Sequence, residues 1–184
     1  MRKISKKIII AAIAALSLMF FSSCKDGSKR TKYDPYSISP HEKIQTSGFE
    51  IPFKFTGSNL KTIHVKLNNS VGYDALFDTG CSSISISGLE ALSLYKSGTL
   101  VASGMSDETI DVTIADGSQI RAMQLLVKNI SVTDTKGEVH SVSDVPVVVM
   151  DDLVAPVLVG SFVIDRLAAS SYTVDLDNRI IRFN

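Results

Sequence analysis

The sequence lacks several features that would assign it to common functional classes. Basic and acidic residues number 19 each, so the chain has none of the basic excess that nucleic-acid binding selects. It contains no glycine-rich phosphate loop and no Gly-x-Ser-x-Gly motif of a serine hydrolase. It also shows no heptads and no repeat of about 20–50 residues. We therefore expect no nucleic-acid partner and no phosphate-loop chemistry.

Histidine is scarce and widely spaced. The three histidines, His41, His64 and His140, lie far apart and do not show the spacing of metal ligands. His64 falls in an alternating segment in which it is expected to face solvent. We therefore expect no metal site and no other cofactor.

A membrane-spanning helix is not expected either, because the uncharged apolar run Ile8–Phe21 is shorter than the about 20 residues required. This run follows a basic segment, Met1–Lys7, which carries four Lys or Arg residues and no acid. Two serines and Cys24 come next. The order of charged, apolar and small residues is typical of an export signal, so residues 1–23 are predicted to be a signal peptide.

The end of this signal, Phe21-Ser22-Ser23-Cys24, resembles a bacterial lipobox, with Phe21 in place of the usual aliphatic residue. The resemblance implies cleavage before Cys24 and attachment of lipid, such as palmitate, to that cysteine. The alternative is an ordinary secretory signal that ends in a cysteine. A lipid anchor would hold the protein at a membrane surface in the cell envelope. Lys25, where an aspartate would signal inner-membrane retention, favours the outer membrane.

Removal of the signal would leave 184 − 23 = 161 residues with a net charge of 15 − 19 = −4, a length that suits one domain. The sequence has two cysteines, so a lipidated Cys24 would leave Cys81 without a partner for an intrachain disulfide. Residues 24–48 are rich in charge, serine and proline and are predicted to be a flexible tether. Residues 49–184 are predicted to be the folded domain.

The folded part is dominated by short alternating or β-branched segments that predict strands. The predicted strands are Phe49–Phe55, Thr62–Asn68, Tyr73–Phe77, Ser83–Ser87, Leu125–Val132 and Val145–Met150. The last of these is apolar except for Pro146, so it should be buried on both faces or start at a sheet edge. Short helices are predicted at Gly88–Lys96 and after Gly160. The fold class is therefore all-β, a barrel or a sandwich with one or two short helices.

Two hairpins are indicated by turn residues between alternating strands. Asp116-Gly117 lies between a strand ending near Ile114 and one resuming at Ile120, and Asp-Gly supplies the positive φ angles of a tight turn. Asp177-Asn178 turns the final hairpin.

A carboxylate, Asp78, follows the apolar strand that ends in Leu76-Phe77, where an unpaired acid would be costly to bury. Phe77-Asp78-Thr79-Gly80 resembles the Asp-Thr-Gly of retropepsin-like aspartic proteases. The resemblance implies a single-domain acid-protease barrel in which Asp78, Thr79 and Gly80 form the catalytic loop. Taken alone, Asp78 would be a turn-capping acid at a strand end.

Further segments occur in the order that this family implies, over roughly residues 51–184. The Asp116 hairpin resembles the flap that covers substrate, with a tip formed by Ala115, Asp116 and Gly117. The segment Leu158-Val159-Gly160 and the helix after it resemble the element that braces the catalytic loop from behind. The alternatives are an ordinary hairpin and a turn glycine.

The sequence departs from the family pattern at Cys81, where alanine or serine is usual, and at Ser161, where retroviral enzymes often have arginine. It is also longer than a viral protease at residues 87–111 and 133–145. Cys81 could act as a thiol nucleophile only with a nearby histidine, so we expect a small buried cysteine instead.

Aspartic proteolysis needs two close carboxylates that share one proton, because two like charges at that distance do not both ionise cheaply. The chain has one Asp-Thr-Gly, so the chemistry requires a homodimer that places one Asp78 from each copy at a two-fold axis. The expected partners are a peptide or protein substrate, a second copy and, through Cys24, a membrane. Two alternatives stay open: a non-catalytic protein of the same fold that binds peptide or a protein partner, and a monomeric structural protein of the envelope.

Overall fold

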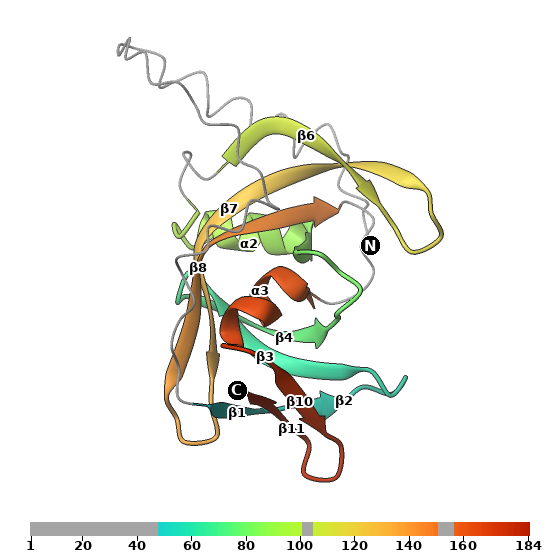
Figure 1. The fold of residues 1–184 in the computed structure, drawn as a ribbon. Coiled ribbons are helices and arrows are strands. Elements are labelled where there is room, and N and C mark those ends of the chain that lie inside the picture. The colour runs from blue at the N-terminus through green and yellow to red at the C-terminus, as the bar shows by residue number, and fades with distance from the viewer. Residues whose placement is uncertain (1–47, 101–104, 151–156) are drawn as a thin grey trace. The chain divides into compact units, whose positions relative to one another are not determined.

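The computed structural model describes residues 48–100, 105–150 and 157–184. These residues form strands and two short helices (Figure 1). None of the described helices is long and apolar enough to cross a membrane. The elements are β1 (Phe49–Pro52), β2 (Lys54–Phe55), β3 (Lys61–Leu67), β4 (Val71–Phe77), β5 (Ile84–Ser87), α2 (Gly88–Lys96), β6 (Met105–Thr113), β7 (Gln119–Thr133), β8 (Val139–Met150), β9 (Leu158–Val159), α3 (Ser161–Leu167), β10 (Tyr172–Asp175) and β11 (Ile180–Phe183).

The larger sheet closes on itself. Its strand order is β2-β3-β4-β9-β5-β8-β7-β6, and β3 pairs a second time, with β7, through Leu67 opposite Ile130. Alternating residues of these strands point inward and are fully buried, among them Ile63, Val65 and Leu67 of β3. Closure removes most free edges, so the interior is filled by side chains from every wall. The predicted all-β class with short helices is confirmed.

The smaller sheet has the order β1-β11-β10 and is antiparallel. It brings the start of the folded part next to its end, with Phe49 opposite Phe183 (Figure 1). Phe49, Ile51, Ile181 and Phe183 are all buried in the common core. Strand β10 pairs only with β11 and has no second neighbour among the described residues. On the outer side of β1, Glu50 O accepts a hydrogen bond from Thr135 N–H of the turn between β7 and β8 at 2.8 Å.

Several predicted elements are confirmed, and three predictions need correction. Helix α2 has the predicted bounds and begins with a capping box, in which Ser87 and Glu90 bond each other's backbone N–H. The segment 49–55 forms two strands, because Phe53 is buried and its N–H bonds Arg179 O instead of a ladder partner. The predicted strand 125–132 is the second half of β7, and 145–150 is the second half of β8.

The apolar end of β8 is buried and not at a sheet edge. From Val147 onward it pairs with β7 on one side and with β5 on the other. Pro146 lies just before that double pairing, opposite Leu126, where its missing N–H disrupts no bond to β5. Its carbonyl accepts a hydrogen bond from Ser83 Oγ at 2.5 Å. The sequence left open whether residues 145–150 are buried on both faces or start at a sheet edge, and the structure shows the buried position.

Candidate active site

The candidate site begins where β4 and β9 end side by side. The two strands are parallel, with Phe77 opposite Val159, so the residues that follow them meet at the same edge of the sheet. Strand β9 lies between β4 and β5. The loop that joins β4 to β5 must therefore pass over the end of β9. This topology places Asp78 next to Gly160, although more than eighty positions separate them in the sequence.

The backbone of this loop, residues 78–83, is held by β9 and by the first turn of α3. Asp78 N–H donates to Val159 O at 3.0 Å. Ser161 N–H donates to Cys81 O at 2.8 Å, and Phe162 N–H donates to Ser82 O at 3.0 Å. Two of the free N–H groups at the start of α3 are thus satisfied by the loop itself. The loop is fixed by main-chain bonds and keeps its side chains available.

Gly160 is required here because the loop passes directly against it. A Cβ atom at this position would lie 2.2 Å from the carbonyl oxygens of both Cys81 and Ser83. Its φ of −96° is open to any residue, so close approach of the backbone is the reason for glycine and strain is not. The predicted brace Leu158-Val159-Gly160 therefore lies directly behind the Asp78 loop.

The Asp78 carboxylate is only partly satisfied within one chain. Its Oδ1 accepts a hydrogen bond from Gly80 N–H at 2.9 Å. No other described residue bonds the carboxylate. Asp78 is half-buried, and Thr79 and Gly80 are exposed at the tip of the loop. The acid is thus rigidly placed and still accessible to water and to a second molecule.

Cys81 follows the triplet and is half-buried, where the sequence had predicted a buried cysteine. Its Sγ lies 3.2 Å from Ser83 O and 3.6 Å from Ser85 Oγ. The thiol is therefore within hydrogen-bonding distance of a carbonyl oxygen of its own loop and of a hydroxyl of β5. No described histidine contacts the thiol, so these residues supply no base for a cysteine nucleophile.

The predicted flap tip lies at the turn between β6 and β7. Gly117 has φ +85° and donates its N–H to Ile114 O at 2.9 Å. Asp116 Oδ1 accepts from Ser118 N–H at 2.8 Å, and hydrogen bonding by Ser118 lowers the pKa of this carboxyl. Ala115, Asp116 and Gly117 are all exposed. In the view of Figure 1 this turn and the carboxyl end of β4 lie on the same side.

The smaller sheet contacts the residue before Asp78, which the sequence had not indicated. Tyr172 of β10 packs edge-on against Phe77, with ring centroids 5.6 Å apart. Tyr172 also lies 6.2 Å from Phe183 of β11. The catalytic candidate is therefore supported from one side by β9 and from another by the β1-β11-β10 sheet.

Similarity to solved structures identifies this architecture. A retropepsin-like aspartic protease from Rickettsia conorii matches with a TM-score of 0.51 and 15% identity, over 74% of this chain and 92% of that one. Basic 7S globulin from soybean matches with a TM-score of 0.44 and 12% identity, over 74% and 42%. The retroviral protease-like domain of Ddi1 from Leishmania major matches with a TM-score of 0.39 and 14% identity, over 64% and 82%.

The fold is therefore retropepsin-like, as the resemblance in the sequence implied. No protein-family model matches the chain, and no curated protein sequence matches it. At 15% identity the Rickettsia structure establishes the architecture and not the chemistry. The signal peptide, Cys24 and nearly all of the tether lie outside the described residues, so these stay predictions.

Proposed function

We propose that the protein is an aspartic endopeptidase that hydrolyses peptide bonds with water activated by Asp78. The observation that carries the proposal is the placement of this acid. Main-chain bonds from β9 and α3 fix the loop, while the carboxylate of the half-buried Asp78 accepts one hydrogen bond from the described residues. A structural acid would be fully satisfied within its own chain. A catalytic acid needs fixed geometry and free oxygen atoms.

The chemistry requires a second carboxylate, supplied by Asp78 of another copy. One carboxylate, ionised, acts as general base on a water held between the two. The other, protonated, donates to the oxygen of the scissile carbonyl. Thr79 and Gly80 shape the loop, and the turn at residues 115–117 closes over the substrate. Leu158, Val159 and Gly160 hold the loop from behind.

The smaller sheet supports the proposed homodimer. Its outer strand β10 pairs only with β11 among the described residues, and an unpaired strand edge is a ready site for pairing with another chain. Tyr172 links β10 to Phe77, next to Asp78. Pairing through this sheet would thus fix the two acids with respect to each other.

The second candidate function is a non-catalytic protein of the same fold that binds peptide or a protein partner. The partly satisfied Asp78 and the exposed turn at 115–117 fit a binding groove as well as an active site. The two functions differ in what happens to a bound peptide.

The test is Asp78→Asn, compared with Asp74→Asn on β4, the strand that leads to Asp78. Asp74 is exposed and pairs only with His64 among the described residues. We expect Asp78→Asn to lower peptide cleavage by about 10²–10⁴-fold, and Asp74→Asn to leave it near wild type. Folding and dimer mass should be unchanged in both. A wild-type protein that cleaves no member of a broad peptide library from about pH 3 to pH 7 would favour the binding protein.

We also propose that Cys24 carries lipid and anchors the protein to the cell envelope, on the strength of the lipobox-like segment. Labelling of cells with radioactive palmitate should mark the wild-type chain and leave Cys24→Ser unmarked. Equal labelling of the two would exclude this site of attachment.

A further inference from the structure

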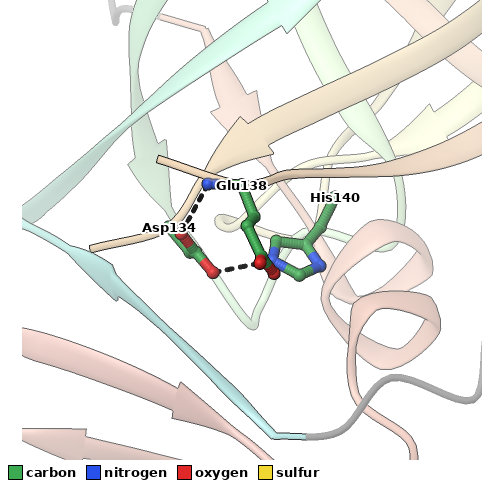
Figure 2. Close-up of side chains that lie close together, drawn as sticks. All are labelled: Asp134, Glu138 and His140. Atoms are coloured by element: carbon green, nitrogen blue, oxygen red, sulfur yellow. Dashed lines mark hydrogen bonds and ion pairs between the residues drawn. The ribbon is translucent and has the colours of Figure 1, made fainter. Parts of the chain in front are cut away.

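A group of three potential metal ligands lies at the opposite end of β7 from the turn at 115–117. The hairpin between β7 and β8 turns through residues 134–138, where Asp134 N–H donates to Glu138 O and Gly137 has φ +88°. Asp134, Glu138 and His140 converge here (Figure 2), with one ligand atom from each side chain within 4.8 Å of the others. Nothing in the proposed protease chemistry uses these residues.

The Asp134 carboxylate is oriented by its own turn. Its Oδ1 accepts N–H groups from Lys136 and Glu138, each at 2.8 Å. The other oxygen, Oδ2, faces His140 Nε2 at 3.0 Å. The side chain is only 2% exposed. One oxygen is therefore fixed by the backbone and the other is presented toward the imidazole, an arrangement that outer-shell hydrogen bonds give to metal ligands.

The imidazole is held by aromatic stacking. His140 lies flat on Phe49, with ring centroids 3.7 Å apart and planes within 6°, and Phe49 stacks in turn on Phe183. The His140 side chain is 12% exposed. Because the ring is clamped, Nε2 points at Asp134 with little freedom to turn away. The third group, Glu138, is exposed and completes the set on the solvent side.

We propose that Asp134, Glu138 and His140 bind a zinc ion at the end of the β7–β8 hairpin. The site lies beside the contacts of this hairpin with β1, namely the stack of His140 on Phe49 and the bond from Thr135 N–H to Glu50 O. Ligand atoms about 2.1 Å from a tetrahedral zinc lie about 3.4 Å apart, so the present separations need only small side-chain adjustments. With a neutral imidazole the three groups carry two negative charges, which a divalent cation neutralises. One nitrogen with carboxylate oxygens suits zinc and disfavours calcium, which takes six to eight oxygen ligands.

A second histidine–aspartate pair in the same domain provides a matched control. His64 Nδ1 lies 2.9 Å from Asp74 Oδ1, nearly the same separation as in the His140 pair. Both of these side chains are about three-fifths exposed, at 60% and 61%, and no third described ligand accompanies them. If the distance between histidine and aspartate alone decided metal binding, the two pairs would bind zinc equally well. The proposal predicts binding at the His140 pair and none at the His64 pair.

The experiment is titration of the metal-stripped full-length chain with zinc by calorimetry, with cobalt(II) absorption as a second measurement. We expect one zinc per chain, no comparable binding of calcium, and no sulfur-to-cobalt band from Cys24 or Cys81. Glu138→Gln keeps the side-chain shape and should weaken zinc binding by at least about tenfold. His140→Ala should abolish binding, and His64→Ala should leave it unchanged.

Three results would overturn the proposal: no zinc binding by the wild-type chain, unchanged affinity in Glu138→Gln, or loss of binding in His64→Ala. His140→Ala removes a stacked ring and risks misfolding. The affinity of Glu138→Gln for zinc is therefore the decisive measurement. The measurement needs no peptidase activity, and it therefore succeeds or fails independently of the role of Asp78.

Discussion

Asp78 and Asp134 both directly follow a strand, β4 and β7, yet the surrounding contacts of the two carboxylates are opposite in kind. Around Asp78 the main chain is tied to β9 and α3, while the carboxylate accepts one hydrogen bond, from Gly80. Around Asp134 it is the carboxylate, and not the main chain alone, that makes the stabilising hydrogen bonds. It accepts two N–H groups of its turn and meets His140, and it is buried.

The difference separates a carboxylate that maintains the fold from one kept available. One oxygen of Asp134, Oδ1, is used by its own turn, and the other faces His140. The neighbouring imidazole holds the pKa of this carboxyl below the usual value. Asp78 contributes little to its own chain, because other atoms already hold its loop. Substitution of Asp134 should therefore affect stability, and substitution of Asp78 should affect activity.

The largest effect on stability is expected at the backbone of the Asp78 loop, not at its acid. In Gly160→Ala the new Cβ would lie 2.2 Å from two carbonyl oxygens that belong to rigid main chain. We expect a loss of about 3 kcal/mol or more in the free energy of unfolding, because neither neighbour can rotate away. Chemical denaturation measures this loss.

Gly57→Ala is the matched control, since a Cβ there has no neighbour within 4 Å. It should unfold like the wild type. If Gly160→Ala were equally stable, the close contact between β9 and the Asp78 loop would be wrong.

The next effect compares the two acids directly. Asp134→Ala removes the acceptor of two turn N–H groups and leaves a part-buried imidazole without its partner, so we expect a melting temperature several degrees below wild type. Asp78→Ala should stay within about 0.5 kcal/mol of wild-type stability while losing peptidase activity. Thermal unfolding and a peptide assay of both variants test this. The comparison fails if Asp78→Ala is the less stable of the two.

The sequence was sufficient to predict most of the fold, because alternation and turn residues report on local structure. The period-two runs placed most of the strands, and Asp116-Gly117 placed a hairpin. The same evidence predicted that Asp78 would end a strand. The pattern does not reveal the continuity of β7: it predicts a separate strand at residues 125–132, whereas β7 is one strand over residues 119–133.

The contacts around both acids could not be predicted, since they depend on residues distant in the chain. Phe49 stacks on His140 only because β1 pairs with β11. The spacing of the histidines alone does not predict a metal site, because two of the three proposed ligands are carboxylates of the same hairpin. The pattern Asp134-x-x-x-Glu138-x-His140 was the available signal, and a predicted turn at residues 134–138 would have brought its members together.

A smaller effect is expected from the turn that positions Asp134. Gly137 has φ +88° and open space around it, so Gly137→Ala should cost about 1 kcal/mol through backbone strain alone. Gly137→Asn should recover part of this loss, because asparagine tolerates the left-handed conformation. Denaturation of the two variants measures the difference. Equal stability of alanine, asparagine and glycine at this position would show that the turn does not impose the conformation.

The smallest effect appears only in acid, at a third aspartate that resembles Asp134 in its hydrogen bonding. Asn178 donates two hydrogen bonds to Asp175 and Arg182 donates a third, which lowers the pKa of Asp175 from its usual 3.8 to about 2. A lowered pKa means that the ionised form stabilises the fold. This contribution is complete above about pH 4 and is lost as the pH falls toward about 2. Asp175→Asn should therefore flatten the decline in melting temperature across that range. Asp177→Asn, a control in the exposed turn that follows Asp175, should retain the wild-type slope. An unchanged slope in Asp175→Asn would mean that hydrogen bonds at this turn do not stabilise the carboxylate, and the same argument would then weaken for Asp134.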